Sequence, residues 1–83
     1  MIASYFGHEL NVPDKMINQY TEELKPVLED EEELYNLRDA IYSLLCLVDL
    51  YPSLLDQERY RKDFIQALAM KEALFNLKVL HDA

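Results

Sequence analysis

Residues 30–52 read DEEELYNLRDAIYSLLCLVDLYP and contain the clearest structural signal in the sequence. Asp30 and Glu33 are spaced as in a capping box, in which each side chain bonds the backbone N–H of the other residue at a helix start. Pro52 stops a helix, because the residue before a proline avoids helical backbone angles. We therefore predict a helix over 31–51. Its large apolar side chains recur at steps of three and four positions, as in a heptad seam: Leu34, Leu37, Ile41, Leu44, Val48 and Tyr51.

A second helix is predicted before this segment, over 13–29. Pro13 suits its first position, because the N–H that proline lacks has no helical partner there. Pro26 interrupts the pattern, since an internal proline removes one backbone hydrogen bond and clashes with the preceding turn. This helix is expected either to end near Leu24 or to continue with a kink.

A third helix is predicted over 54–81, capped by Ser53. About three residues separate it from the helix over 31–51, so the two are expected to form a long antiparallel hairpin. Two apolar stripes run along it, which is more apolar surface than one short, proline-interrupted helix can cover. The first stripe is Tyr60, Phe64, Ala67, Met70, Leu74 and Leu77, and the second is Ile65, Leu68, Phe75 and Val79.

The composition points to the same fold class. The chain has 83 residues, 51% of them hydrophobic, with one glycine and three prolines, a composition typical of long helices with short connections. We predict a single all-α domain over 1–83 with three helices, in which residues 1–12 form a lead-in that folds back on the core. Because the second stripe lacks a cover, we expect it to be a dimer or partner face. A homodimer would then complete a four- or six-helix bundle.

The formal net charge of −8 argues against direct binding to nucleic acid, whose affinity depends on Lys and Arg contacts to phosphates. It equally argues against binding to anionic membranes. Cys46 is the only cysteine, so no internal disulfide is possible, and its apolar neighbours predict a buried thiol. Residues 1–9 do not resemble a signal peptide, and no apolar run is long enough to span a bilayer. A cytoplasmic location is expected.

Two groups of residues are candidate partner-binding sites. Tyr35, Arg38 and Tyr42 share one face of the helix over 31–51, and Tyr and Arg are enriched in binding hot spots. The alternative is that both rings only cover the edge of the core. The second group is the acidic run Glu29, Asp30, Glu31, Glu32 and Glu33, which either docks on a basic partner or only stabilises the start of a helix.

The basic cluster Arg59, Arg61 and Lys62 is expected to face the acidic run within the chain, and the alternative is that it holds an anion or a nucleic-acid backbone. No catalytic residues are predicted, because the sequence has neither a glycine-rich phosphate loop nor a nucleophile motif. No metal site is predicted either, because His8 and Glu9 lack a second histidine at position 12, which is Val12. The chain is therefore not expected to be an enzyme or to need a cofactor.

The sequence favours a small, acidic interaction module that binds another protein as a regulator, adaptor or inhibitor. One alternative is a helical bundle that handles a small molecule or a metal, with a pocket among Phe64, Met70, Phe75 and His81. A weaker alternative is an acidic nucleic-acid mimic, as an inhibitor or immunity protein would use. The size and acidity are shared by many small bacterial and phage proteins, but no motif carries a resemblance to a particular family.

Overall fold

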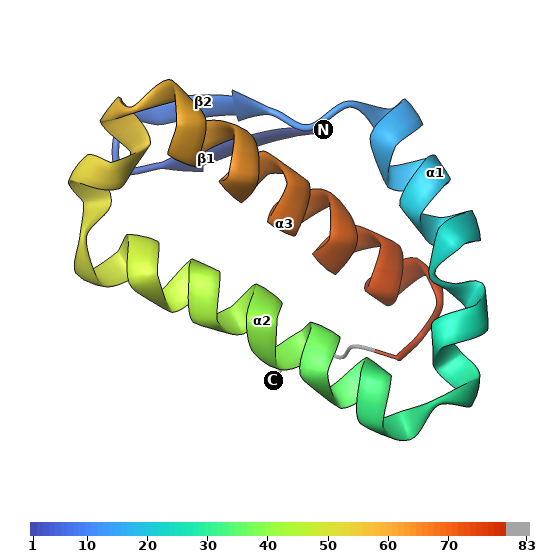
Figure 1. Ribbon diagram of the computed structural model, residues 1–83. Coiled ribbons are helices and arrows are strands. Elements are labelled where there is room, and N and C mark those ends of the chain that lie inside the picture. The colour runs from blue at the N-terminus through green and yellow to red at the C-terminus, as the bar shows by residue number, and fades with distance from the viewer. Residues whose placement is uncertain (80–83) are drawn as a thin grey trace.

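The structure is a computed structural model that describes residues 1–79, and it is mostly helical with a small two-stranded sheet. The helix α3 lies between the other elements, with the β-hairpin along one side, α2 along the other and α1 at one end (Figure 1). The elements in chain order are β1 (Ile2–Tyr5), β2 (His8–Asn11), α1 (Asp14–Glu23), the 3-10 helix η1 (Lys25–Glu29), α2 (Glu31–Leu50), the 3-10 helix η2 (Pro52–Asp56) and α3 (Glu58–Asn76).

The predicted mostly helical fold is confirmed, but the prediction of an all-α fold is wrong. Residues 1–12 are not an irregular lead-in, because β1 and β2 pair as antiparallel strands with Ala3 opposite Leu10 and Tyr5 opposite His8. The hydrogen bond from the Val12 N–H to the Met1 carbonyl, 2.7 Å long, extends this pairing by one residue. Side chains alternate between the faces of a strand, so one face of the hairpin packs on the core and the other meets solvent.

The turn of the hairpin places a bulky residue in an unfavourable backbone conformation. Phe6 has φ +50° and Gly7 has φ +84°, as in the two-residue turns that match the twist of a hairpin. Glycine adopts such angles freely, whereas a bulky side chain there costs about 1–2 kcal/mol. Asparagine tolerates this region and is the preferred partner of glycine in such turns.

Phe6→Asn is therefore expected to raise the free energy of unfolding by about 0.5–1 kcal/mol. In a domain of this size, that corresponds to a rise in melting temperature of roughly 2–8 °C. Gly7→Ala is the opposing variant: a Cβ at Gly7 would meet nothing within 4 Å, so only its positive φ makes the change destabilising. Thermal unfolding followed by circular dichroism measures both, and equal melting temperatures for the two variants would contradict the assigned turn.

The segment predicted as one helix over 13–29 is divided in two. The α-helix α1 ends at Glu23, and η1 continues the chain with Pro26 in its first turn. A proline there has no N–H to contribute to the α-helical ladder. The chain therefore changes to 3-10 geometry and bends toward α2 (Figure 1).

Half of the capping box predicted for α2 is confirmed, because Asp30 Oδ1 accepts a 3.1 Å hydrogen bond from the Glu33 N–H. The Asp30 N–H donates to the Val27 carbonyl at 3.1 Å instead of to the Glu33 side chain. Asp30→Ala is expected to lower the free energy of unfolding by about 1 kcal/mol, because it leaves that donor without its cap. Asp30→Asn is the matched control, since asparagine caps about as well as aspartate. Chemical denaturation distinguishes the two variants, and an equal loss in both would assign the effect to charge instead of capping.

The connection between α2 and α3 differs from the prediction. Pro52–Asp56 form η2 instead of the first turn of a helix over 54–81, and α3 begins only at Glu58 and ends at Asn76. Within residues 1–79, Ser53 provides no side-chain cap, and η2 instead points Leu55 into the core, where it is fully buried. The α3 helix then runs back in the direction opposite to α2 (Figure 1).

The core consists of two clusters of buried side chains, both of which include α3. The first joins the hairpin, α1, α2 and η2 around Phe64, whose ring meets Tyr5 edge to face at a centroid distance of 5.0 Å. The second joins Leu24 and Ile41 to Ala73 and Leu74. Ala69 and Ala73 are fully buried, and their small side chains allow the surrounding elements to pack closely on α3.

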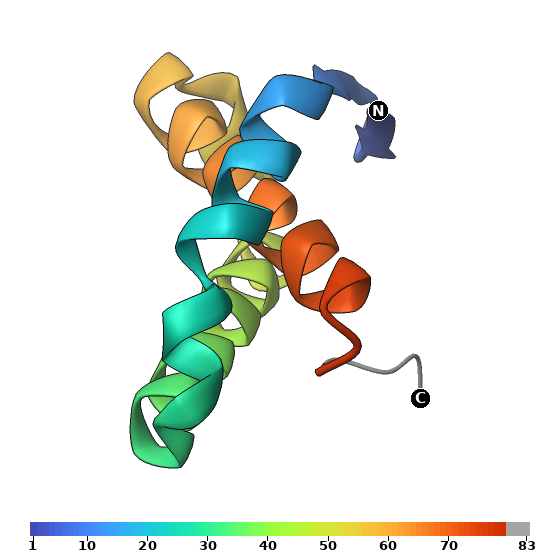
Figure 2. The ribbon, with the colours of Figure 1, turned by 90° about the vertical axis from the view of Figure 1, so that its right-hand side faces the viewer.

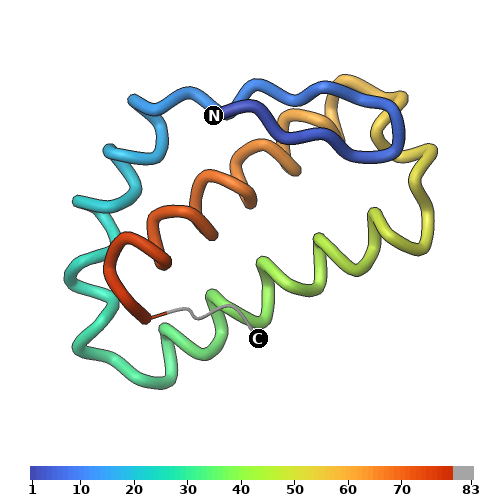
Figure 3. The backbone as a smooth tube through the Cα atoms, turned by 180° about the vertical axis from the view of Figure 1, so that it is seen from behind, coloured from blue at the N-terminus to red at the C-terminus, as the bar shows by residue number. Residues whose placement is uncertain are grey.

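The second stripe of α3 is largely covered within the chain. Leu68 is only 2% exposed, and Ile65 is half-buried against the first cluster. Phe75 and Val79 are half-buried against the second cluster. The hairpin supplies much of the missing cover, because it lies along the first half of α3 (Figure 3), while α1 crosses α3 on another side (Figure 2). Leu68 is thus not accessible to a partner.

Candidate protein-binding surface

Among residues 1–79, five of the eight exposed large apolar side chains lie on α2 or directly after it, and the other three, Met1, Ile2 and Phe6, belong to the hairpin. Opposite the buried Ile41 and Val48, this helix faces solvent with a row of large side chains, of which Tyr35 is 63% and Leu50 73% exposed. Neighbours three or four positions apart lie side by side on a helix, so these side chains form one continuous strip. We call this strip the α2 outer face: Tyr35, Asp39, Tyr42, Cys46, Leu47, Leu50 and the following Tyr51.

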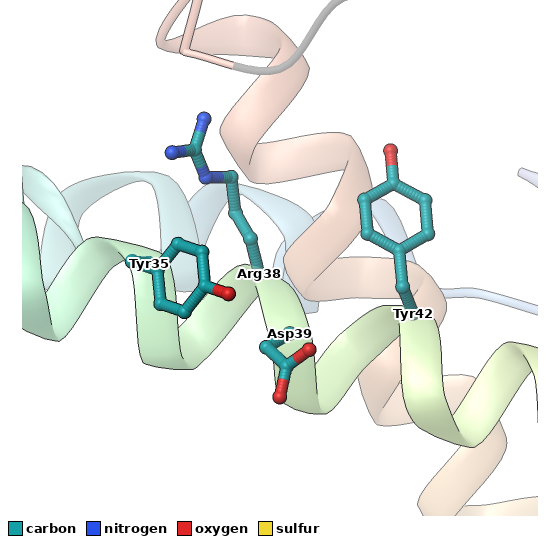
Figure 4. Close-up of a pocket in the computed structure, with 4 residues that line it drawn as sticks. All are labelled: Tyr35, Arg38, Asp39 and Tyr42. Carbon is teal, nitrogen blue, oxygen red and sulfur yellow. The ribbon is translucent and has the colours of Figure 1, made fainter.

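The predicted residues Tyr35, Arg38 and Tyr42 do lie together, around a shallow pocket of about 290 Å³ that Asp39 also lines. In Figure 4, the side chains of Arg38 and Asp39 point to opposite sides of the helix. Arg38 is half-buried, and its Nη1 donates a 3.2 Å hydrogen bond to the Val79 carbonyl. Arg38 therefore ties α2 to the segment after α3, while Tyr35 and Tyr42 remain exposed.

The residues of the acidic run Glu29–Glu33 are all exposed where η1 meets the start of α2. Glu22 and Glu23 at the end of α1 are also exposed, and Lys25 bonds Glu22 at 2.9 Å. We call these seven carboxylates the acidic end: Glu22, Glu23, Glu29, Asp30, Glu31, Glu32 and Glu33.

The basic cluster does not face the acidic end, contrary to the prediction. Arg59, Arg61 and Lys62 lie in the first turns of α3, at the opposite corner of the molecule from the start of α2 (Figure 1). Lys62 pairs locally with Glu58 at 3.6 Å, and Arg59 lies over the Tyr60 ring. Among residues 1–79, no ion pair joins the basic cluster to the acidic end. The reason is that η2 turns α3 back so that its C-terminal half approaches the start of α2.

Cys46 was predicted to be buried, and this is wrong because its side chain is exposed on the α2 outer face. The prediction used its apolar neighbours Leu45 and Leu47, but these lie on different sides of the helix. Leu45 is half-buried against the core, whereas Leu47 is exposed. An apolar stretch of a helix therefore does not by itself establish burial.

The residues expected to line a small-molecule pocket are not brought together. Phe64 belongs to the first core cluster, Met70 and Phe75 pack against the second, and His81 lies outside the described residues. A hollow of about 340 Å³ lies elsewhere, lined by residues of the β2–α1 junction and α3: Asn11, Pro13, Met16, Lys62, Ile65 and Gln66. In the part of the chain that the structure describes, no group of His, Cys, Asp and Glu side chains is arranged to hold a metal ion.

Sequence reasoning missed Leu47, Leu50 and Tyr51 as surface residues. A signal for them was present, since α2 has leucines outside the seam as well as in it. A helix that is apolar on several sides needs cover on several sides. At the C-terminal end of α2, Val48 is buried and Leu45 is half-buried, whereas Leu47 and Leu50 are exposed, so this end is covered on one side only.

Comparison with known protein families, curated proteins and solved structures found no match to this chain. Within residues 1–79, none of the helices combines the length and the apolar character needed to cross a membrane.

Proposed function

We propose that this chain is a small, acidic protein-interaction module of the cytoplasm, a regulator, adaptor or inhibitor that binds another protein through the α2 outer face. The observation that carries the proposal is the exposure of Leu47, Leu50 and Tyr51 beside Tyr35 and Tyr42. Isolated apolar side chains on a surface are ordinary, but a contiguous apolar strip marks an interaction site.

The residue types support the same conclusion. Tyrosines bury a large area at low entropic cost and still offer a hydroxyl, which makes them frequent anchors in protein interfaces. Leu50 projects directly away from the core, since Ile41 and Val48 face inward. Burying an exposed leucine against a partner contributes roughly 1.5–3 kcal/mol.

Site-specific photo-crosslinking in the native cell tests this proposal. The crosslinking amino acid replaces Ser43, which is exposed beside the strip, and in a control it replaces Asn18, which is exposed on α1. We expect a discrete adduct from position 43 and none from position 18. Adding Leu50→Ser is expected to reduce the adduct at least tenfold, because it removes the most exposed apolar anchor. An adduct that is unchanged by Leu50→Ser would contradict the proposal.

A second candidate function rests on the acidic end. Seven exposed carboxylates accompany only one lysine there, a charge density that resembles a row of phosphates. An acidic mimic of nucleic acid would use this end to block a basic groove of another protein. The same crosslinking experiment separates the two functions, because a mimic would yield its adduct from position 32 and not from position 43.

A further inference from the structure

Resting on the proposed function, we infer that the occupant of the α2 outer face is a basic amphipathic helix of another protein. The first argument is charge. Between Lys25 and Arg59 the sequence has a single basic residue, Arg38. Because Arg38 is half-buried and bonded to the Val79 carbonyl, the strip offers a partner almost only carboxylates as charged groups.

These carboxylates lie within the strip and beside it. Asp39 lies between the two tyrosines, and Asp49 lies beside Leu50, both of them exposed. The run Glu31–Glu33 lies at the start of the same helix. A complementary surface must therefore be largely apolar and carry Lys or Arg where it meets Asp39, Asp49 and the start of α2, since opposite charges steer association and like charges oppose it.

The shape of the strip selects a helix as the partner element. The strip lies on α2, whose 20 residues span about 30 Å, and a helix offers no free backbone edge to which an extended peptide could pair. Ridges of side chains on one helix pack into grooves on another. The shallow pocket between the Tyr35 and Tyr42 rings is lined by Arg38 as well as Asp39, so it offers a partner side chain two aromatic rings and one group of each charge (Figure 4).

A second copy of this chain fits the strip poorly. In a two-fold symmetric pair the same patch meets itself, so both copies would bring Asp39 and Asp49 into one contact. No lysine of the strip is present to compensate those four carboxylates. The charge pattern therefore favours a different, basic chain over the homodimer expected from the second stripe of α3.

Three designed peptides of about 18 residues, long enough to span most of α2, test the inference with the intact 83-residue chain. The first is an amphipathic helix of Leu and Lys. The second has the same composition in a scrambled order without an apolar face, and the third replaces Lys by Glu. Fluorescence anisotropy measures affinity, and amide shifts in NMR spectra locate binding. We expect the first peptide to bind at least tenfold more tightly than the others. We also expect it to shift the amide resonances of residues 35–51.

Matched variants separate apolar from charged contributions. Leu50→Ser is expected to weaken binding of the Leu/Lys peptide about tenfold, and Asp39→Asn/Asp49→Asn about three- to tenfold. Glu9→Gln/Asp63→Asn removes the same net charge from exposed positions on β2 and α3 and is expected to change the affinity by less than twofold. Equal losses of affinity in the two double variants would overturn the inference, because binding would then depend on the overall charge of the chain and not on the carboxylates of α2.

Three further outcomes overturn the inference in distinguishable ways. Equal binding of the scrambled peptide means that no helical face is recognised. A concentration-dependent dimer in sedimentation equilibrium that Leu50→Ser dissociates means that a second copy occupies the strip. An adduct from position 43 in the cell without binding of the Leu/Lys peptide means that the protein has a partner of other chemistry, and the proposed function stands. Without that adduct, the proposed function fails as well.

Discussion

Replacing Phe64 by alanine is expected to lower the free energy of unfolding by about 3–5 kcal/mol. Phe64 is only 1% exposed, and it joins α3 to the hairpin through its edge-to-face contact with Tyr5. The substitution removes that contact and leaves a cavity that the surrounding helices fill only in part. A loss of this size is a large fraction of the stability of a small domain, so urea denaturation should show a variant that is close to unfolded in water.

Two further variants keep this result interpretable. Phe64→Leu retains most of the side-chain volume and is expected to cost less than about 1.5 kcal/mol, which leaves a measurable unfolding transition. Phe6→Ala removes the same phenyl group from the exposed hairpin turn and should change stability by about 0.5 kcal/mol or less. Comparable losses from Phe64→Ala and Phe6→Ala would show that the hairpin does not pack on α3 as described.

Leu55→Ala is expected to cost about 2–5 kcal/mol, the second-largest effect. Leu55 is fully buried in the first core cluster, although it belongs to the short η2 connection. Leu50→Ala is the matched control, since it deletes the same atoms from a side chain that is 73% exposed. Its expected cost is within about 0.5 kcal/mol.

The same pair of leucines distinguishes stability from binding. Denaturation midpoints measured by circular dichroism should fall for Leu55→Ala and remain near the wild-type value for Leu50→Ala. Partner binding should weaken for Leu50→Ala. For Leu55→Ala, the affinity of the molecules that remain folded should stay near the wild-type value. If Leu50→Ala unfolds the chain as readily as Leu55→Ala, the α2 outer face is part of a core and not a binding surface.

Local features of the sequence were sufficient to predict α2 and its cap. The start of a helix depends on a few adjacent residues, and the bond from the Glu33 N–H to Asp30 joins residues only three positions apart. The tyrosines of the binding surface were predicted for a similar reason, because residues seven apart share one helix face. Their exposure depends on which elements cover α2, and the helical repeat of the sequence does not predict those contacts.

The hairpin was missed because its evidence is not local. Each strand has only four residues, too few for alternation to stand out from chance. A two-stranded hairpin alone is marginally stable in water, so β1 and β2 need the surface of α3. The turn also lacks its usual sequence signature, because Phe6 occupies a position with positive φ where asparagine, aspartate or glycine is common. The two apolar stripes of α3 did indicate that a further element covers this helix, but they were interpreted as a dimer or partner face.

The place of α3 in the chain has a consequence for biosynthesis. Ribosomes make the hairpin before the surface that buries it, because Phe64 and Leu68 follow the hairpin by more than 50 residues. Until that surface leaves the exit tunnel, Tyr5, Leu10 and Val12 of the nascent chain have no native apolar cover. These elements therefore complete their fold only after α3 is made, and the hairpin is the part that a nascent-chain chaperone would meet in the meantime.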